Sequence, residues 1–195
     1  MRIAFWFDFA STYSYLASQR IDEACGRAGV EVRHTPFLLG PIFHEQLGIK
    51  DSPFNVQPVR GKYMWRDLER LCEKYGLPWK RPSVFPRHSV LAARVLCAAK
   101  GDPELSRRIF RANFAEDRDI ASAEVLAEIA GKDLVEQAQS QEVKDELRAN
   151  TDEARTLGIF GAPDFVVGGE LFFGHDRMDD AIAWARRESP RPLSS

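Results

Sequence analysis

IAFWFDFASTYSYL, residues 3–16, joins an apolar run directly to a helical pattern. The run over residues 2–7 is short, apolar and aromatic, which is typical of a buried strand. Residues 13–28 read as one helix that Gly29 closes, because glycine is favoured just after a helix end. Residues 30–37 alternate and predict a second strand, parallel to the first because the connection is helical. The opening of the chain therefore predicts a β-α-β unit.

Two serines, Ser11 and Ser14, stand at the predicted junction of strand and helix with the spacing of a Cys-x-x-Cys redox motif. The junction has no thiol, so sulfur chemistry there would need an external thiol, for which glutathione is the obvious source. Ser11 is the candidate catalytic residue, because a hydroxyl that donates to a thiolate favours the charged form, as does a helix N-terminus. The alternative, that Ser11 only caps the helix, remains equally open.

The composition limits the kind of protein this is. With 44% hydrophobic residues in 195 and a net charge of −2, the chain predicts a packed core and no nucleic-acid partner. Disorder is expected at most in the tail, residues 189–195. No segment reads as a signal peptide or a membrane span, so we expect a cytoplasmic protein without membrane contact. The scattered cysteines, none in a Cys-x-x-Cys pair, fit a reducing compartment and are expected to pack as small apolar residues: Cys25, Cys72 and Cys97.

The middle and end of the chain have different patterns. Residues 38–60 hold three prolines and two glycines and are expected to be irregular, whereas helices are expected from residue 62 to about 156. These helices are predicted over residues 63–75, 88–100, 103–114 and 122–130, with one or two more over residues 136–157. Two short apolar runs, 165–167 and 171–173, flank Gly168-Gly169 and predict a hairpin, and residues 176–187 predict a closing helix.

This order predicts an α/β fold, with a thioredoxin-like core, β-α-β … β-β-α, interrupted by a large all-helical insertion. We expect a thioredoxin-like domain from residues 1–40 and 157–195, and an insertion domain from residues 41–156 with an irregular N-terminal segment.

A second site signal is Gly161-Ala162-Pro163, which precedes the returning strand. Proline is tolerated at the first residue of a strand, and in thioredoxin-like folds it is cis and faces the active-site helix. The backbone of Ala162 would then be an open strand edge, where a peptide such as glutathione pairs through its cysteinyl group. A trans turn proline is the alternative, and we expect the cis form.

Further candidates are polar residues near the predicted site. Asp176, beside His175 and Arg177, is either a helix cap or a partner for an α-ammonium group. Asn55, Arg60 and Lys62 either bind the carboxylates of glutathione or belong to a solvated basic face. The histidines show no ligand spacing, so no metal site is expected: His34, His44 and His88.

Together these residues resemble the 2-hydroxychromene-2-carboxylate isomerases, relatives of kappa-class glutathione transferases and of the disulfide oxidoreductase DsbA. The likeness covers essentially the whole chain and is carried by FDFASTYSYLA (7–17), KYMWRDL (62–68), YGLP (75–78), GIFGAP (158–163) and FGHDR (173–177). This chain departs from the family pattern at Thr12, Asp164 and His175.

The resemblance implies a homodimer that binds glutathione with its sulfur near Ser11 and its backbone against Ala162 and Pro163. It also implies that the rest of the tripeptide is held by Asn55, Lys62, His175 and Asp176. The implied reaction interconverts 2-hydroxychromene-2-carboxylate and trans-o-hydroxybenzylidenepyruvate, an aromatic carboxylate pair, in the breakdown of naphthalene-type compounds. The alternative is a kappa-like glutathione transferase or peroxidase that acts on another electrophile.

Overall fold

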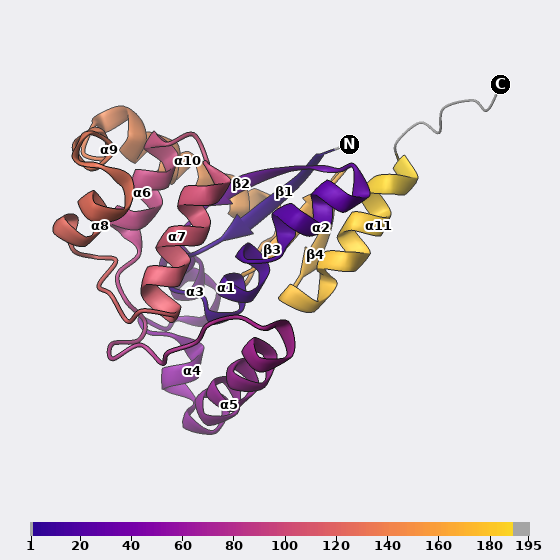
Figure 1. The fold of residues 1–195 in the computed structure, drawn as a ribbon, viewed down its shortest axis with the longest axis horizontal. Coiled ribbons are helices and arrows are strands. Elements are labelled where there is room, and N and C mark those ends of the chain that lie inside the picture. Colours follow the sequence, from indigo (N-terminus) through magenta and orange to yellow (C-terminus); the bar gives the residue numbers. More distant parts are fainter. Residues whose placement is uncertain (1, 189–195) are drawn as a thin grey trace.

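A four-stranded mixed sheet lies at the centre of the fold, with the strand order β2-β1-β3-β4 (Figure 1). In this computed structural model, which describes residues 2–188, β1 (Arg2–Phe7) pairs in parallel with β2 (Glu31–Pro36). On its other side β1 pairs antiparallel with β3 (Asp164–Val167), which forms a hairpin with β4 (Glu170–Phe173). The predicted β-α-β unit and hairpin are confirmed, and the tail over residues 189–195 lies outside the described residues.

The single helix predicted over residues 13–28 is wrong, because the structure has two: α1 (Thr12–Ser18) and α2 (Ile21–Ala28). Two side chains at the break bond to backbone carbonyl groups. The Ser18 hydroxyl donates to the Tyr15 carbonyl oxygen at 2.8 Å, and the Gln19 amide donates to the Arg107 carbonyl oxygen. Serine side chains that bond nearby backbone groups are known to interrupt helices in this way.

The irregular segment predicted over residues 38–60 is also wrong, because most of it is helical. It contains α3 (Leu39–Leu47), the short α4 (Pro53–Val56) and the first residues of α5 (Pro58–Tyr75). Proline fits the first turn of a helix, where its missing N–H has no intrahelical partner. Pro53 and Pro58 therefore mark two helix starts, and Gly48, with φ 67°, ends α3.

The remaining helices follow the sequence pattern with shifted ends. The predicted helix at residues 122–130 is confirmed, with Ser122 as its cap and Gly131 after it. The stretch 136–157 is split, and the closing helix begins after a 3-10 turn, η1 (His175–Arg177). The bounds are α6 (Val90–Ala98), α7 (Pro103–Phe114), α8 (Ala123–Ala130), α9 (Lys132–Gln137), α10 (Gln141–Thr156) and α11 (Met178–Glu188).

Both faces of the sheet are covered by helices. One face shares a continuous core with α1, α2, α11 and the helices inserted between β2 and β3, in which Phe9 packs on Phe110 at 4.7 Å between ring centroids. The other face is covered by α3 and α10, where Trp6 packs with Ile42 and Ala154. Figure 1 shows α6 to α10 gathered beside the sheet and α4 and α5 projecting away from it. The division into two domains stays a prediction. The candidate active site lies where β1 ends.

Candidate active site

Ser11 lies where β1 passes into α1, and its hydroxyl makes two contacts. The hydroxyl donates a hydrogen bond to the Ala162 carbonyl oxygen at 3.0 Å and accepts one from the Ser14 N–H at 3.2 Å. The second contact is an N-cap, so the capping role is present. The first joins two segments 151 positions apart in the chain, as their predicted juxtaposition requires. The catalytic role of Ser11 stays a prediction.

The segment facing Ser11 is the strand edge predicted from the sequence. The Ala162-Pro163 peptide bond is cis, as expected, and so is Phe85-Pro86, which was not predicted. The Pro163 carbonyl oxygen accepts the Gly174 N–H at 2.9 Å, whereas no group among the described residues accepts the Ala162 N–H. Ala162 therefore keeps one free donor beside the Ser11 hydroxyl.

A cavity of about 980 Å³ opens beside this contact, and both Ser11 and Ala162 line it. Its volume is at the upper end of the usual range for ligand sites, which is about 300–1,000 Å³. Much of the wall is aromatic, and Phe160 and Phe173 pack together at 4.5 Å between ring centroids. A Cβ at Gly161 would lie 2.4 Å from the Phe173 ring, so a glycine there lets this aromatic wall form. The cavity can hold a planar, apolar molecule next to the polar contact.

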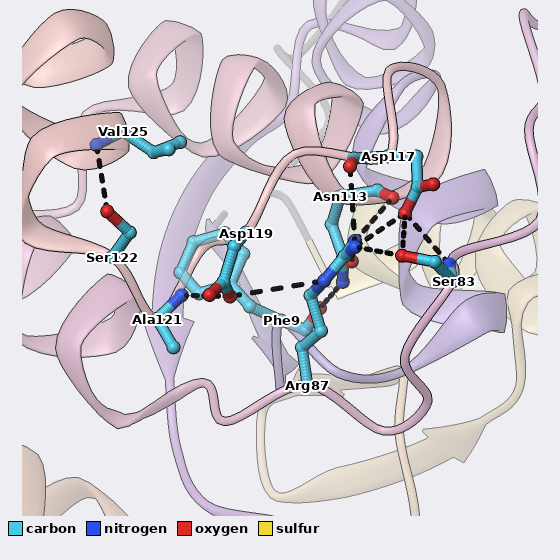
Figure 2. Close-up of polar contacts among 9 residues, drawn as sticks. All are labelled: Phe9, Ser83, Arg87, Asn113, Asp117, Asp119, Ala121, Ser122 and Val125. Atoms are coloured by element: carbon cyan, nitrogen blue, oxygen red, sulfur yellow. Dashed lines mark hydrogen bonds and ion pairs between the residues drawn. The ribbon is translucent and has the colours of Figure 1, made fainter.

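Four side chains that can carry positive charge line the cavity, but one of them is already neutralised. Arg87 is buried and pairs with Asp117 at 2.5 Å, as Figure 2 shows. Arg60 makes no ion pair within the described residues and lies 5.9 Å from the centre of the Phe54 ring. Arg60, together with Lys50 and His88, is thus available to a bound anion.

Two predicted ligands of the tripeptide do not line this cavity. The Asn55 amide donates to the Asp51 carboxylate at 3.0 Å and to the Phe85 carbonyl oxygen at 3.0 Å, so it connects α4 with the segment before α6. Lys62 is exposed on α5. Their roles in binding stay predictions.

The other two predicted ligands lie beside α1. The ring of His175 stacks on Tyr13 at 5.3 Å, and its Nδ1 is buried with no partner among the described residues. Burial lowers the pKa of His175 below its usual value, so the ring is held neutral. Asp176 is exposed within the 3-10 turn. Neither residue lines the cavity, although Tyr13 does.

Asp164 departs from the family pattern, and the structure shows an unusual setting for it. Its side chain is fully buried after Pro163, and neither carboxylate oxygen has a hydrogen-bond partner within residues 2–188. Its register partners are Trp6 on β1 and Phe173 on β4, neither of which can carry charge. Burial raises the pKa of Asp164 to about 8, so the carboxyl is neutral at pH 7.

The three cysteines are free and buried, as expected from the sequence. Burial raises the pKa of Cys72 to about 11 and that of both Cys25 and Cys97 to about 12. A thiol with such a pKa is almost entirely protonated at neutral pH and is a poor nucleophile.

Asp8 and the aromatic wall were not predicted from the sequence. Asp8 is a cavity-lining carboxylate, and burial raises its pKa above the usual value. Its signal was a charge directly after an apolar strand, next to Ser11. Phe160 and Phe173 offered a weaker signal, since each neighbours a glycine and only the fold brings them together.

No group of three metal-binding side chains occurs in residues 2–188, and none of their helices is long and apolar enough to cross a membrane.

Comparison with known proteins gives one family match and several full-length relatives. The model of the DSBA-like thioredoxin domain matches residues 2–182. The chain is 31% identical to a protein named glutathione S-transferase kappa 2 from Caenorhabditis elegans, over 90% of this chain and 88% of that protein. It is 29% identical to a 2-hydroxychromene-2-carboxylate isomerase from Sphingobium xenophagum, over 91% of this chain and 94% of that protein.

Solved structures confirm the predicted thioredoxin-like fold. A 2-hydroxychromene-2-carboxylate isomerase superposes with a TM-score of 0.83 at 23% identity, over 100% of both chains. The cytosolic disulfide reductase DsbM from Pseudomonas aeruginosa, solved with GSH, superposes with a TM-score of 0.66 at 19% identity, over 96% of this chain and 98% of that one.

Proposed function

The chain belongs to the family of DSBA-like thioredoxin domains, with 2-hydroxychromene-2-carboxylate isomerases and kappa-class glutathione transferases among its relatives, and we propose that it is a glutathione-dependent isomerase. Its substrate is an aromatic carboxylate with a conjugated C=C bond, as in the pair 2-hydroxychromene-2-carboxylate and trans-o-hydroxybenzylidenepyruvate. We also propose that the protein is a cytoplasmic homodimer.

One observation carries the proposal: an alcohol, not a thiol, faces the open strand edge. The Ser11 hydroxyl lies 3.0 Å from the Ala162 carbonyl oxygen, and all three cysteines are buried with raised pKa values. No pair of cysteines can therefore act as a dithiol at this edge. A site of this shape that performs sulfur chemistry must receive its thiol from a bound molecule.

The residues at the edge fit a glutathione peptide. The free Ala162 N–H can donate to a cysteinyl carbonyl, and the Ala162 carbonyl can accept a cysteinyl N–H, as in strand addition. When that happens, the Ser11 hydroxyl hydrogen is released from Ala162 and can turn toward the sulfur. The Ser14 N–H continues to donate to Ser11 Oγ and so makes the hydroxyl a better donor.

Glutathione held at this edge would supply a thiolate for reversible addition to the C=C bond of the substrate, which would be single and able to rotate while the sulfur is attached. The task of Ser11 is to stabilise the thiolate by a hydrogen bond. The aromatic wall of Phe160 and Phe173 holds the ring of the substrate, and Arg60 or Lys50 attracts its carboxylate.

Glutathione is expected to raise the melting temperature of the pure protein, because a ligand that binds only the folded state stabilises it. At a concentration about 100 times its Kd, the gain is about 2.7 kcal/mol of unfolding free energy. The measurement is a thermal melt with glutathione and with its S-methyl derivative as the comparison. A melting temperature unaffected by glutathione would remove the peptide from the site.

The reaction itself is tested by following the absorbance of the chromene and benzylidenepyruvate pair with and without glutathione. A transferase is the second candidate, since the kappa-class relative is 31% identical. Stable conjugation of glutathione to an electrophile such as 1-chloro-2,4-dinitrobenzene, without isomerisation of the chromene, would favour that second candidate.

A further inference from the structure

Ser11 lies at the end of a turn over residues 8–11, and hydrogen bonds to the backbone of this turn hold it in place. The Ser11 N–H donates to the Asp8 carbonyl oxygen at 2.9 Å, and the Ala10 N–H donates to one oxygen of the buried Asp8 carboxylate, also at 2.9 Å. The other carboxylate oxygen accepts the Leu39 N–H at 2.8 Å, at the start of α3. Asp8 therefore ties the turn to a helix that forms one wall of the cavity.

Another polar group of the turn, the Phe9 carbonyl oxygen, is held from the opposite side. It accepts a hydrogen bond from the Asn113 amide nitrogen at 3.0 Å, and Asn113 is buried on α7. Figure 2 shows that the oxygen of the same amide faces Arg87, whose Nη1 donates to it at 3.0 Å. Since a guanidinium only donates, Arg87 fixes which end of the amide points to Phe9.

Arg87 is itself held in place. Its Nη2 donates to the Asp117 carboxylate at 2.5 Å and to the Ser83 hydroxyl at 3.2 Å. Burial of an ion pair has a desolvation cost that its attraction does not always offset, so apolar residues could fill this position at lower cost. What the charged group adds here is a fixed orientation of Asn113.

We propose that Asn113, oriented by Arg87, is a positioning residue for Ser11. The Phe9 carbonyl lies two residues before Ser11, so its anchor determines where the Ser11 hydroxyl points. A hydrogen bond weakens steeply when its angle is lost, and a displaced hydroxyl would no longer favour the thiolate. The catalytic meaning of this positioning rests on the proposed function, whereas the positioning itself does not.

A cysteine introduced at position 11 tests the geometry of the turn without glutathione. In the Ser11→Cys variant, the sulfur can accept the Ser14 N–H as the hydroxyl oxygen does now. The native cysteines, with pKa values of about 11 to 12, stay protonated near neutral pH and do not interfere. The pKa of the introduced thiol is then measured from thiolate absorbance and from its rate of alkylation by iodoacetamide.

Asn113→Ala in the Ser11→Cys background is expected to raise the pKa of the introduced thiol by about one unit, and so to slow alkylation at neutral pH about tenfold. The matched control is Asn150→Ala. Asn150 is also a buried amide, and its nitrogen donates to the Pro36 carbonyl oxygen at 3.1 Å, on β2 and not within residues 8–11. We expect the control to lower the melting temperature to a similar extent and to leave the thiol pKa unchanged.

In the protein that retains Ser11, Asn113→Ala is expected to lower kcat about tenfold with the KM for glutathione changed less than about threefold. Equal pKa shifts in the two alanine variants, or no shift in either, would overturn the inference. Should Asn113→Ala fail to fold, Arg87→Lys replaces it, since lysine keeps the charge and loses the planar fork. A thiol that responds to Asn113, in a protein whose wild type binds no glutathione, would contradict the proposed function and uphold the positioning role.

Discussion

Replacing Ser11 with alanine is expected to lower turnover about ten- to a hundredfold, because a charge-assisted hydrogen bond is worth about 1.5–3 kcal/mol. The reason is the Ser11 hydroxyl, which can donate to a thiolate docked against Ala162 and so lower the pKa of the bound thiol. The apparent pKa of glutathione on the enzyme should rise by about one to two units in the variant. The measurements are the pH profile of kcat and the thiolate absorbance of the bound peptide.

Ser11→Ala also removes a helix cap, which by itself costs about 0.5–2 kcal/mol of stability. The control for this effect is Ser122→Ala, because Ser122 caps α8 in the same way, accepting the Val125 N–H at 3.3 Å, as Figure 2 shows. We expect the two variants to lose similar stability, and only Ser11→Ala to lose activity. Full activity in Ser11→Ala with glutathione bound would exclude Ser11 from the mechanism.

Asp164→Asn is expected to remove a large pH dependence of stability. The carboxyl has a pKa of 3.8 when unfolded and about 8 when folded, because burial without a partner disfavours its charged form. The folded state thus holds one more proton than the unfolded state between these two values. The stabilising contribution is complete below about pH 4, is lost as the pH rises, and is gone above about pH 8.

In the wild type, Asp164 should lower the free energy of unfolding by about 1.4 kcal/mol for each pH unit in this window. Asparagine cannot ionise, so the Asp164→Asn curve should be flatter by that amount. The measurement is urea unfolding between about pH 5 and pH 8, with Asp179→Asn, an exposed carboxylate on α11, as the matched control. Identical slopes for the wild type and Asp164→Asn would show that Asp164 is ionised in the folded protein.

The sequence was a good guide wherever the signal was local. The run over residues 2–7, the glycine pair at Gly168-Gly169 and the cap at Ser122 each act within a few residues, and the structure confirms the elements they predict. Over residues 38–60 the prolines predicted an irregular segment, whereas Pro53 and Pro58 begin helices, because proline marks helix starts as readily as loops. The break after Ser18 was not predicted, and one of the bonds made there joins Gln19 to Arg107, 88 positions away.

The candidate site was partly predictable because some of its sequence signals are also local. Ser11 and Ala162 could be paired because each lies at a recognisable junction of the fold, and the structure places them in contact. Asn55, Lys62 and Asp176 were candidates by residue type, whereas His175 came only from the resemblance. The binding roles of all four stay predictions.

By itself, the sequence determined that serine replaces cysteine at the junction of strand and helix, and that a proline precedes the returning strand. Both are properties of residue identity and local spacing. Only the tertiary structure decided that Arg87 is neutralised, whereas within the part of the chain that the structure describes Arg60 has no ion pair and Asp164 is buried without a partner. The tertiary structure also decided that Asn113 holds the turn before Ser11. Burial and hydrogen-bond partners depend on segments that meet through folding, and neighbours along the chain carry no record of them.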